Sequence, residues 1–275
     1  MKIRIISGVT LLAVVATTFI FGGYPLIAFC CLTSVVSFYE LTKAMGVIGD
    51  KVFNGLSVTG YIGILVYYFI LFFKPEWENK DMVFILLIAL VLANLAVYVF
   101  TFPRYNAGQA VASVFSVIYA PFLFSYIYKI RTDFEMGAYL VFLVLAASSA
   151  SDAGAYFIGV AIGKHKLAPV LSPKKTIEGA IGGILTAAVI AGVYGYFCAI
   201  NGVGDMELIW QFAVASAVGS VISQVGDLAA SAIKRDYSIK DYGWIIPGHG
   251  GAMDRIDSIV VVAPIIYYAF MISIG

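Results

Sequence analysis

The stretch MVFILLIALVLANLAVYVF, residues 82–100, carries no charged side chain over nineteen positions. Such a run is long enough for an α-helix to cross the hydrocarbon core of a bilayer, which takes about 20 apolar residues. Residues 3–21 and 258–274 form similar runs with few or no charges. Strands are not expected, because an open sheet edge cannot satisfy its hydrogen bonds in lipid. We therefore predict an all-α fold, that of a polytopic helical membrane protein.

Nine segments of this kind follow one another along the chain. They cover residues 3–22, 24–44, 56–73, 82–101, 108–129, 136–162, 176–200, 208–234 and 256–274. Several of the short connections contain Gly, Pro and charged residues, which are turn signals. No internal repeat stands out. We predict a single membrane domain, 1–275, with an amino-terminal helical half, 1–135, and a catalytic half, 136–275.

The overall composition supports this class. Apolar residues make up 61% of the chain, whereas a soluble domain has about 45–50%. The net charge of +1 says little about partners, and nucleic acid is not expected as one. Cys30, Cys31 and Cys198 lie in apolar segments at a spacing that fits no metal site, so we interpret them as small buried hydrophobes.

Basic residues are unevenly distributed over the connections. Those after the second, fourth, sixth and eighth predicted helices carry 11 of the 17 Lys and Arg residues, and the other face carries 6. The positive-inside bias makes the first face cytoplasmic, although Lys2 and Arg4 oppose this orientation. We expect a multi-pass protein of the cell (inner or plasma) membrane with its active site facing the cytoplasm.

The most polar part of the chain is SAIKRDYSIKDYGWIIPGHGGAMDRID, residues 231–257. It contains four Lys or Arg, four Asp, one His and five Gly or Pro between two apolar segments. The chain as a whole is only 12% charged. This density of ionisable groups at a membrane edge indicates chemistry on a charged substrate, with metal ions and phosphates as the expected partners.

Two acids inside predicted helices, Asp152 and Asp227, are candidate site residues. Asp152 stands among small residues in SSASDAGAY, and close helix packing explains those small neighbours but not the acid. Asp227 shares a helix face with Ser231 and Lys234, at i+4 and i+7, and Gln224 joins that face. The alternative to a site is a buried Asp–Lys pair. Because the polar stripe runs into the charged loop, we favour a site.

Two further acids, Asp254 and Asp257, stand at the start of the last predicted helix. Acids there also interact favourably with the helix dipole, which is the structural alternative. Hard cations such as Mg²⁺ prefer a few carboxylates and phosphate oxygens. Asp227 and Asp254 come from helices joined by one loop, so we predict that they meet at a metal. In that loop, the glycines around His249 allow the backbone to approach an anion.

The connection after the sixth predicted helix is also basic. Ser172 is a candidate N-cap and Pro173 the first helical residue, which puts Lys174, Lys175 and Thr176 in the first turn. A helix amino terminus with two lysines is a natural phosphate site. The alternative is simple anchoring of the loop on the positive side of the membrane.

The polar stretch resembles the signature of phosphatidate cytidylyltransferases, also called CDP-diacylglycerol synthases. The matching residues are Ser231, Lys234, Arg235, Lys240, Asp241, Gly243, Pro247, His249, Gly250, Gly251, Asp254, Arg255 and Asp257. Residues 152–156, 163–166, 172–176 and 178–179 look like a second sequence block of that family. Ala252 and Val160 depart from the pattern, where a larger aliphatic and a basic residue are usual.

The resemblance implies a membrane enzyme that joins CTP and phosphatidic acid to give CDP-diacylglycerol and pyrophosphate. It implies Mg²⁺ on Asp227 and Asp254, with a second cation as an option, and homo-oligomers remain open. The implied catalytic residues are Asp227, Asp254, Lys234, Arg235 and Asp257. The implied substrate-binding residues are Asp152, Ser172, Lys174, Lys175, Thr176, Ser231, Lys240, Asp241, His249, Gly250, Gly251 and Arg255.

Two alternatives remain at this point. A cation-coupled transporter would explain acids at positions 152 and 227, but not the clustered polar loop. A CTP-dependent enzyme that acts on a different lipid phosphate would show the same motifs. The first is distinguished by release of pyrophosphate from CTP, and the second by substrate profiling.

Overall fold

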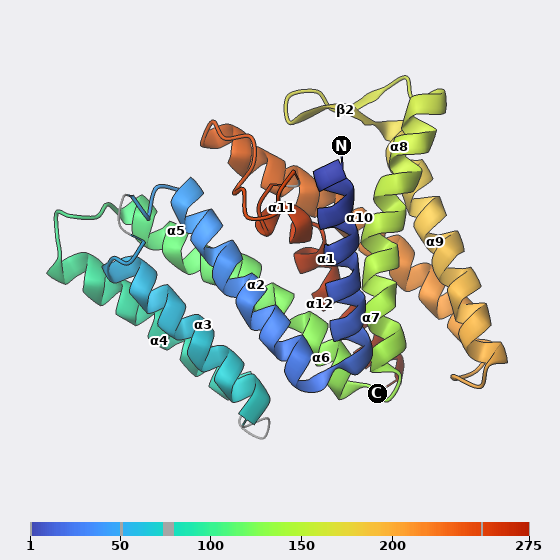
Figure 1. Cartoon of the computed structure of the whole chain (residues 1–275), viewed down its shortest axis with the longest axis horizontal. Helices are drawn as coiled ribbons and strands as arrows, with labels where there is room; N and C mark the ends of the chain where they lie inside the picture. The colour runs from blue at the N-terminus through green and yellow to red at the C-terminus, as the bar shows by residue number, and fades with distance from the viewer. Residues whose placement is uncertain (1, 50–51, 74–79, 249, 275) are drawn as a thin grey trace. The chain divides into compact units, whose positions relative to one another are not determined.

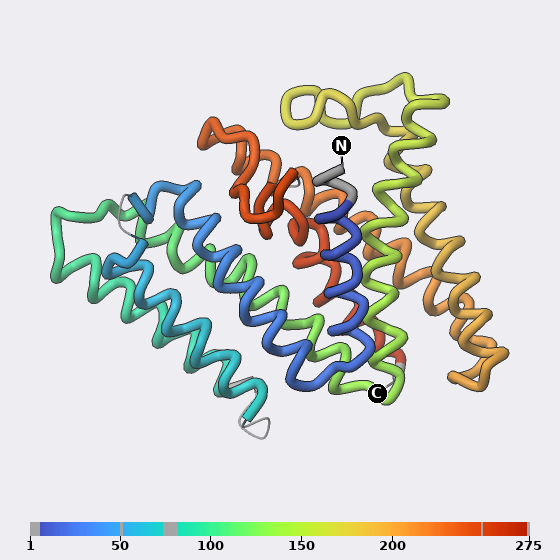
Figure 2. Tube along the Cα trace, viewed as in Figure 1, coloured from blue at the N-terminus to red at the C-terminus, as the bar shows by residue number. Residues whose placement is uncertain are grey.

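The computed structural model describes residues 2–49, 52–73, 80–248 and 250–274. The chain forms two compact units. The first comprises Met1–Ser125 together with Tyr237–Arg255, and the second comprises Tyr126–Asp236 together with Ile256–Gly275. The loop with the most charge therefore belongs to the unit built by the amino-terminal helices. Figure 1 labels the elements, and Figure 2 traces the chain through them.

The first unit is helical. Its elements are α1 (Lys2–Phe21), α2 (Gly23–Ala44), α3 (Gly55–Phe73), α4 (Lys80–Phe100), α5 (Ala107–Val117), the π-helical turn η2 (Ile118–Phe122) and most of the short helix α11 (Met253–Ile256). Helix α5 begins with a capping box, in which Asn106 accepts from the Gln109 backbone N–H and the Gln109 side chain accepts from the Asn106 N–H. Pro121 accounts for the π turn, because it has no N–H to donate.

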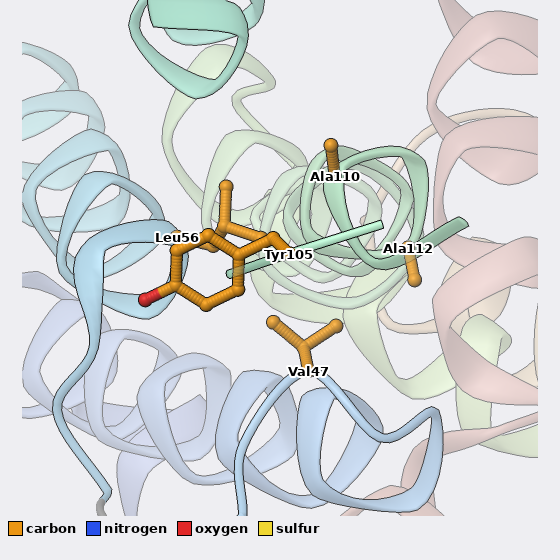
Figure 3. Packing of buried hydrophobic residues seen from close by; sticks show 5 residues of the cluster. All are labelled: Val47, Leu56, Tyr105, Ala110 and Ala112. Carbon is orange, nitrogen blue, oxygen red and sulfur yellow. The ribbon is translucent and has the colours of Figure 1, made fainter. Parts of the chain in front are cut away.

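A small core holds the connections of this unit together. Val47, Leu56, Tyr105, Ala110 and Ala112 pack against one another, as Figure 3 shows. The Tyr105 hydroxyl accepts a hydrogen bond from the Gly55 N–H at 3.0 Å, so this tyrosine also fixes the start of α3. The segment that follows α2 is thereby tied to the helices on either side of it.

The second unit contains the remaining elements. They are α6 (Tyr126–Asp133), α7 (Gly137–Leu145), the π-helical turn η3 (Ala146–Ala150), α8 (Ser151–Ile162), β1 (Lys166–Ala168), β2 (Ser172–Thr176), α9 (Ile177–Ile200), α10 (Leu208–Asp236) and α12 (Ile259–Ile274). Small residues bring α8, α9 and α10 close together. A Cβ at Gly154 would lie 2.3 Å from the Thr186 hydroxyl oxygen, and Ser151 and Ser220 hydroxyls meet at 2.7 Å. Such close approach is typical of membrane helices.

The multi-pass helical architecture is confirmed. Eight helical segments in the described residues are long and apolar enough to cross a membrane. They are Gly23–Ala44, Gly55–Phe73, Met82–Phe100, Ala107–Asp133, Gly137–Ile162, Ile177–Ile200, Leu208–Asp236 and Met253–Ser273. Ile6–Phe21 is a shorter apolar helix at the place of the first predicted span.

One connection differs from the prediction. An antiparallel hairpin pairs β1 with β2, Lys166 with Thr176 and Ala168 with Ser172 (Figure 1), so the expectation of no strands is wrong. Ser172 is not a helix cap, and Lys174 and Lys175 lie on β2 rather than in a first helical turn. Pro173 explains the difference, because the residue before a proline favours extended backbone. The hairpin lies outside the spanning segments, where lipid does not forbid an open strand edge.

Candidate active site

Polar and apolar side chains of the second unit line one cavity of about 510 Å³, which we call the hairpin pocket. Its polar lining comes from α8, both strands and α10, and α9 adds Gly179 and Ala180. The polar residues are Asp152, Lys166, Ser172, Lys174, Lys175, Thr176 and Gln224. The structure thus brings together residues that sequence analysis took from three separate segments.

An ion pair lies beside this pocket. Lys175 on β2 donates to a carboxylate oxygen of Asp227 on α10, with the two side chains 27% and 29% exposed. The position of Asp227 on one continuous helix with Ser231 and Lys234 is confirmed. The pairing alternative therefore holds in part, but the lysine comes from the hairpin and not from the same helix. A partly exposed pair of this kind contributes little to stability and can be displaced by a ligand.

The hairpin is attached to α9 by Glu178. Its carboxylate accepts from the backbone N–H groups of Lys164, at 3.1 Å, and His165, at 3.2 Å, and it lies 2.6 Å from the His165 Nδ1. Thr176 caps α9, since its hydroxyl accepts from the Gly179 N–H at 3.1 Å. These contacts fix both ends of the hairpin, and so hold its lysines at the pocket.

Glycines at the end of α8 and in the first turn of α9 make room for this cap. A Cβ at Gly163 would lie 2.6 Å from the Thr176 hydroxyl oxygen, and one at Gly159 or Gly179 would lie 2.9 Å away. Real Cβ atoms do not approach so closely, so a side chain at any of these positions would displace Thr176. The glycines here allow α8 to pack against α9, and Gly159 and Gly179 also line the hairpin pocket.

The first unit presents a second polar cavity, of about 370 Å³, on residues 237–255, which we call the signature loop. Lys240, Asp241, Trp244 and Arg255 line it, together with backbone at several glycines. Gly248 and Gly250 have φ of 78° and 86°, values that favour glycine, and the Ile246 N–H donates to the Gly250 carbonyl at 3.0 Å. The loop is therefore a defined turn that exposes cationic side chains.

Asp254 is turned toward the loop's own backbone. Its Oδ2 accepts from the N–H groups of Tyr242, at 2.8 Å, and Gly251, at 3.1 Å. Asp254 lies on α11, whereas Asp257 lies in the turn before α12 and accepts from the Ser258 N–H at 2.8 Å. The expectation that both acids occupy the first turn of one last helix is wrong, because α11 ends at Ile256 and Asp257 lies in the turn that separates it from α12.

Glu40, which sequence analysis did not select, is part of the same loop structure. It lies on α2, is 1% exposed, and accepts from the N–H groups of Ala252, at 3.1 Å, and Met253, at 2.8 Å. The signal for it was available, because an acid inside an apolar span is costly and is a functional candidate by default. The signal was weak because Glu40 stands near the end of its span.

The remaining predicted residues are placed as follows. Ser231, Lys234 and Arg235 occupy the last turns of α10, and Gly250 and Gly251 lie in the signature loop. His249 lies outside the described residues. Within those residues, no three His, Cys, Asp or Glu side chains cluster as a metal site would require. Asp227 and Asp254 belong to different units, so their sharing of one ion stays a prediction.

The chain that carries these two pockets can be compared with known proteins. A model of the cytidylyltransferase family matches residues 2–273. The chain belongs to the cytidylyltransferase family. It is 32% identical over 274 residues to the phosphatidate cytidylyltransferase of Bacillus subtilis (strain 168), covering 98% of this chain and 97% of that protein.

Other relatives agree with this. The phosphatidate cytidylyltransferase of Staphylococcus saprophyticus is 31% identical over 268 residues, and that of Staphylococcus aureus (strain COL) is 30% identical over 269 residues. Each alignment covers 97% of both chains. Because the family match covers nearly the whole chain, this protein is a nucleotidyl-transferring membrane enzyme. The transporter alternative is excluded.

Proposed function

We propose that this protein is a phosphatidate cytidylyltransferase, which converts CTP and phosphatidic acid to CDP-diacylglycerol and pyrophosphate. The observation that carries the proposal is the hairpin pocket, where Lys174 and Lys175 meet Asp152 and Gln224 beside Asp227. Cations and carboxylates around a cavity between membrane helices suit a phosphate-bearing substrate and its counter-ion. The names of the full-length relatives supply the substrate pair.

In the proposed reaction, an oxygen of the lipid phosphate attacks the α-phosphorus of CTP. A phosphorus–oxygen bond forms there, and the bond from the α-phosphorus to the bridging oxygen breaks, so that pyrophosphate leaves with the electron pair. The attacking phosphate is already anionic, and no general base is required. Catalysis then consists of in-line positioning and charge neutralisation. Lys175 can supply positive charge to phosphates once they compete for its contact with Asp227.

We assign Asp227 and Asp254 as the carboxylates that hold Mg²⁺. The donor chemistry fits, because hard divalent cations take carboxylate oxygens together with phosphate oxygens of the substrate. Asp227 is partly exposed beside the hairpin pocket, and Asp254 is oriented by two backbone N–H groups. Bound Mg²⁺ would neutralise the phosphates and stabilise the leaving group. A second cation is a further proposal of the same kind.

The signature-loop pocket contributes Lys240, Asp241 and Arg255, which we assign to substrate phosphates and their orientation. Lys234 and Arg235, in the last turn of α10, are assigned to the same role. We place the hairpin and the signature loop on the cytoplasmic side of the cell membrane, because the connections after the second, fourth, sixth and eighth predicted helices carry 11 of the 17 basic residues. Homo-oligomer formation stays a prediction.

The orientation is tested by cysteine labelling. In a background without Cys30, Cys31 and Cys198, a single cysteine at position 238 should react with an impermeant reagent only after the cells are opened. Ser238 is exposed, so a folded protein leaves it accessible from its own side. Labelling from outside intact cells would overturn the cytoplasmic assignment.

The function itself is tested with the purified protein in detergent or vesicles. Labelled CTP and phosphatidic acid should give a lipid-soluble CDP product and pyrophosphate, and the yield should depend on Mg²⁺. Diacylglycerol, which has no phosphate, is the matched control and should give no product. An enzyme that uses CTP with another lipid phosphate but not with phosphatidic acid would replace this proposal with the second candidate.

A further inference from the structure

We propose that Glu40 is a positioning residue for catalysis, because its buried carboxylate fixes the backbone that carries Asp254 and Arg255. The inference rests on the proposed function for its kinetic consequences, but its structural part stands on contacts within the first unit. Glu40 comes from α2 and reaches the signature loop across more than two hundred residues of sequence, with separations of 212 and 213 for its two hydrogen bonds.

The contact is a two-point one. Oε1 accepts from the Ala252 N–H at 3.1 Å, and Oε2 accepts from the Met253 N–H at 2.8 Å. These two donors begin the turn that continues into α11, in which the Arg255 N–H donates to the Ala252 carbonyl at 3.0 Å. A carboxylate that is 1% exposed must be satisfied by such donors, since burying it without them is costly. Glu40 therefore sets where this turn starts.

Two signature glycines are explained by the same carboxylate. A Cβ at Gly251 would lie 2.4 Å from both oxygens of Glu40, and a Cβ at Gly243 would lie 2.1 Å from Oε1. Neither glycine has the positive φ that Gly248 and Gly250 have. At positions 248 and 250, glycine is needed because the backbone has a positive φ. At positions 243 and 251, glycine is needed because Glu40 occupies the space that a side chain would take.

Glu40 and Asp254 together hold four backbone N–H groups of one loop. Asp254 takes those of Tyr242 and Gly251, and Glu40 takes the next two along the chain. Tyr242 and Met253 are themselves buried, at 6% and 0% exposure. Arg255 is exposed, and the backbone that carries it is held by the carboxylates of Glu40 and Asp254. Misplacing a catalytic group by about 1 Å can cost about a hundredfold in rate, so this frame matters for turnover.

The test uses the full-length enzyme in detergent, with two independent measurements. Glu40→Gln keeps the size of the side chain but replaces one acceptor oxygen with an NH₂ group facing a backbone donor. Hydrogen exchange in peptides from 237–255 should quicken, while exchange in the hairpin, 163–176, should not change. For cytidylyl transfer, kcat should fall about tenfold or more while the KM for CTP changes by less than about threefold. Glu40→Asp should recover part of kcat.

A double-mutant cycle tests the geometry directly. Gly251→Ala should be strongly impaired when Glu40 is present, and its further effect on exchange and kcat should largely vanish in the Glu40→Ala background, since the clash is then absent. Gly248→Ala, where the strain is conformational, should cost the same in both backgrounds. Ser37→Ala, at a buried hydroxyl one turn earlier on α2 with no hydrogen-bond partner among the described residues, is the control for general disturbance of the helix and should be near neutral.

Unchanged exchange in 237–255 for Glu40→Gln would overturn the inference, as would equal loss of protection throughout the protein. If Glu40→Gln does not fold, Gly243→Ala and Gly251→Ala decide the matter, since unchanged exchange of the loop in both would contradict it. The exchange measurement does not depend on the reaction. If the proposed function is wrong but this inference is right, the enzyme will show no cytidylyl transfer, while Glu40→Gln will still quicken exchange in 237–255.

Discussion

The signature loop of the first unit and the hairpin of the second are both attached by a glutamate, but in different ways. Glu40 is buried on α2 and holds the signature loop through backbone N–H groups alone. Glu178 lies in the first turn of α9, is 23% exposed, and holds the hairpin through two backbone N–H groups and the His165 ring. A buried clamp leaves a loop one conformation, whereas a partly exposed clamp competes with water. We therefore predict that loosening the loop affects turnover more, and that loosening the hairpin affects substrate affinity more.

The largest expected effect tests the carboxylates assigned to Mg²⁺. Asp227→Asn and Asp254→Asn keep shape but remove charge, and each should lower kcat at least about a hundredfold, the scale of lost metal charge stabilisation. Product formation from labelled CTP over a range of Mg²⁺ concentrations measures it. Asp236→Asn, at the exposed end of α10, is the matched control and should retain activity. Near wild-type turnover of both variants at saturating Mg²⁺ would refute the assignment.

A smaller effect is expected at the ion pair of the hairpin pocket. Lys175→Met removes the partner of Asp227 and a charge facing the phosphates, so the KM for CTP should rise about tenfold or more, the scale of a charge-assisted hydrogen bond. Lys175→Arg should recover activity only partly, because the fork of a guanidinium does not reproduce a point charge. Steady-state kinetics with each substrate varied in turn measure both.

The same experiment separates the two substrates. Lys174 lies on the same strand and lines the same pocket, but is more exposed, so Lys174→Met should raise the KM for CTP less than Lys175→Met does. The response to phosphatidic acid should change less in both. A double Met variant with unchanged CTP kinetics and an impaired response to lipid would move these lysines to the lipid headgroup.

Local sequence patterns predicted the spans well and the site contacts only in part. Predicted spans 24–44 and 56–73 agree to within one residue with the observed Gly23–Ala44 and Gly55–Phe73. The agreement is close because hydropathy in a membrane chain dictates where helices lie. The stripe of α10 was also predictable, since i+4 and i+7 spacing is local. The hairpin was not predicted, because Ser-Pro at its second strand suits a helix start as well as extended backbone.

Long-range partners account for most of what was missed. Lys175 lies 52 residues from Asp227, and Glu40 lies 212 residues from Ala252, so no periodicity connects them. The glycines at 243 and 251 were recognised as motif residues. The reason that no larger residue fits there is the volume of Glu40, which lies on a helix distant in sequence. Local sequence thus indicates the chemistry of a motif, whereas the distant residues that orient the motif are known only from the fold.

The smallest expected effect concerns Glu178, the partly exposed clamp. Glu178→Gln keeps an acceptor oxygen but loses charge toward the N–H groups of Lys164 and His165, so the hairpin should loosen only partly. The KM for CTP should rise about two- to fivefold with kcat nearly unchanged, which is the scale of one neutral hydrogen bond. Hydrogen exchange should quicken in 163–176 and not in 237–255. Glu207→Gln, at an exposed glutamate before α10, should change neither. If Glu178→Gln lowered kcat as strongly as Glu40→Gln, exposure would not distinguish the two clamps, and the hairpin would share the rigid role assigned to the loop.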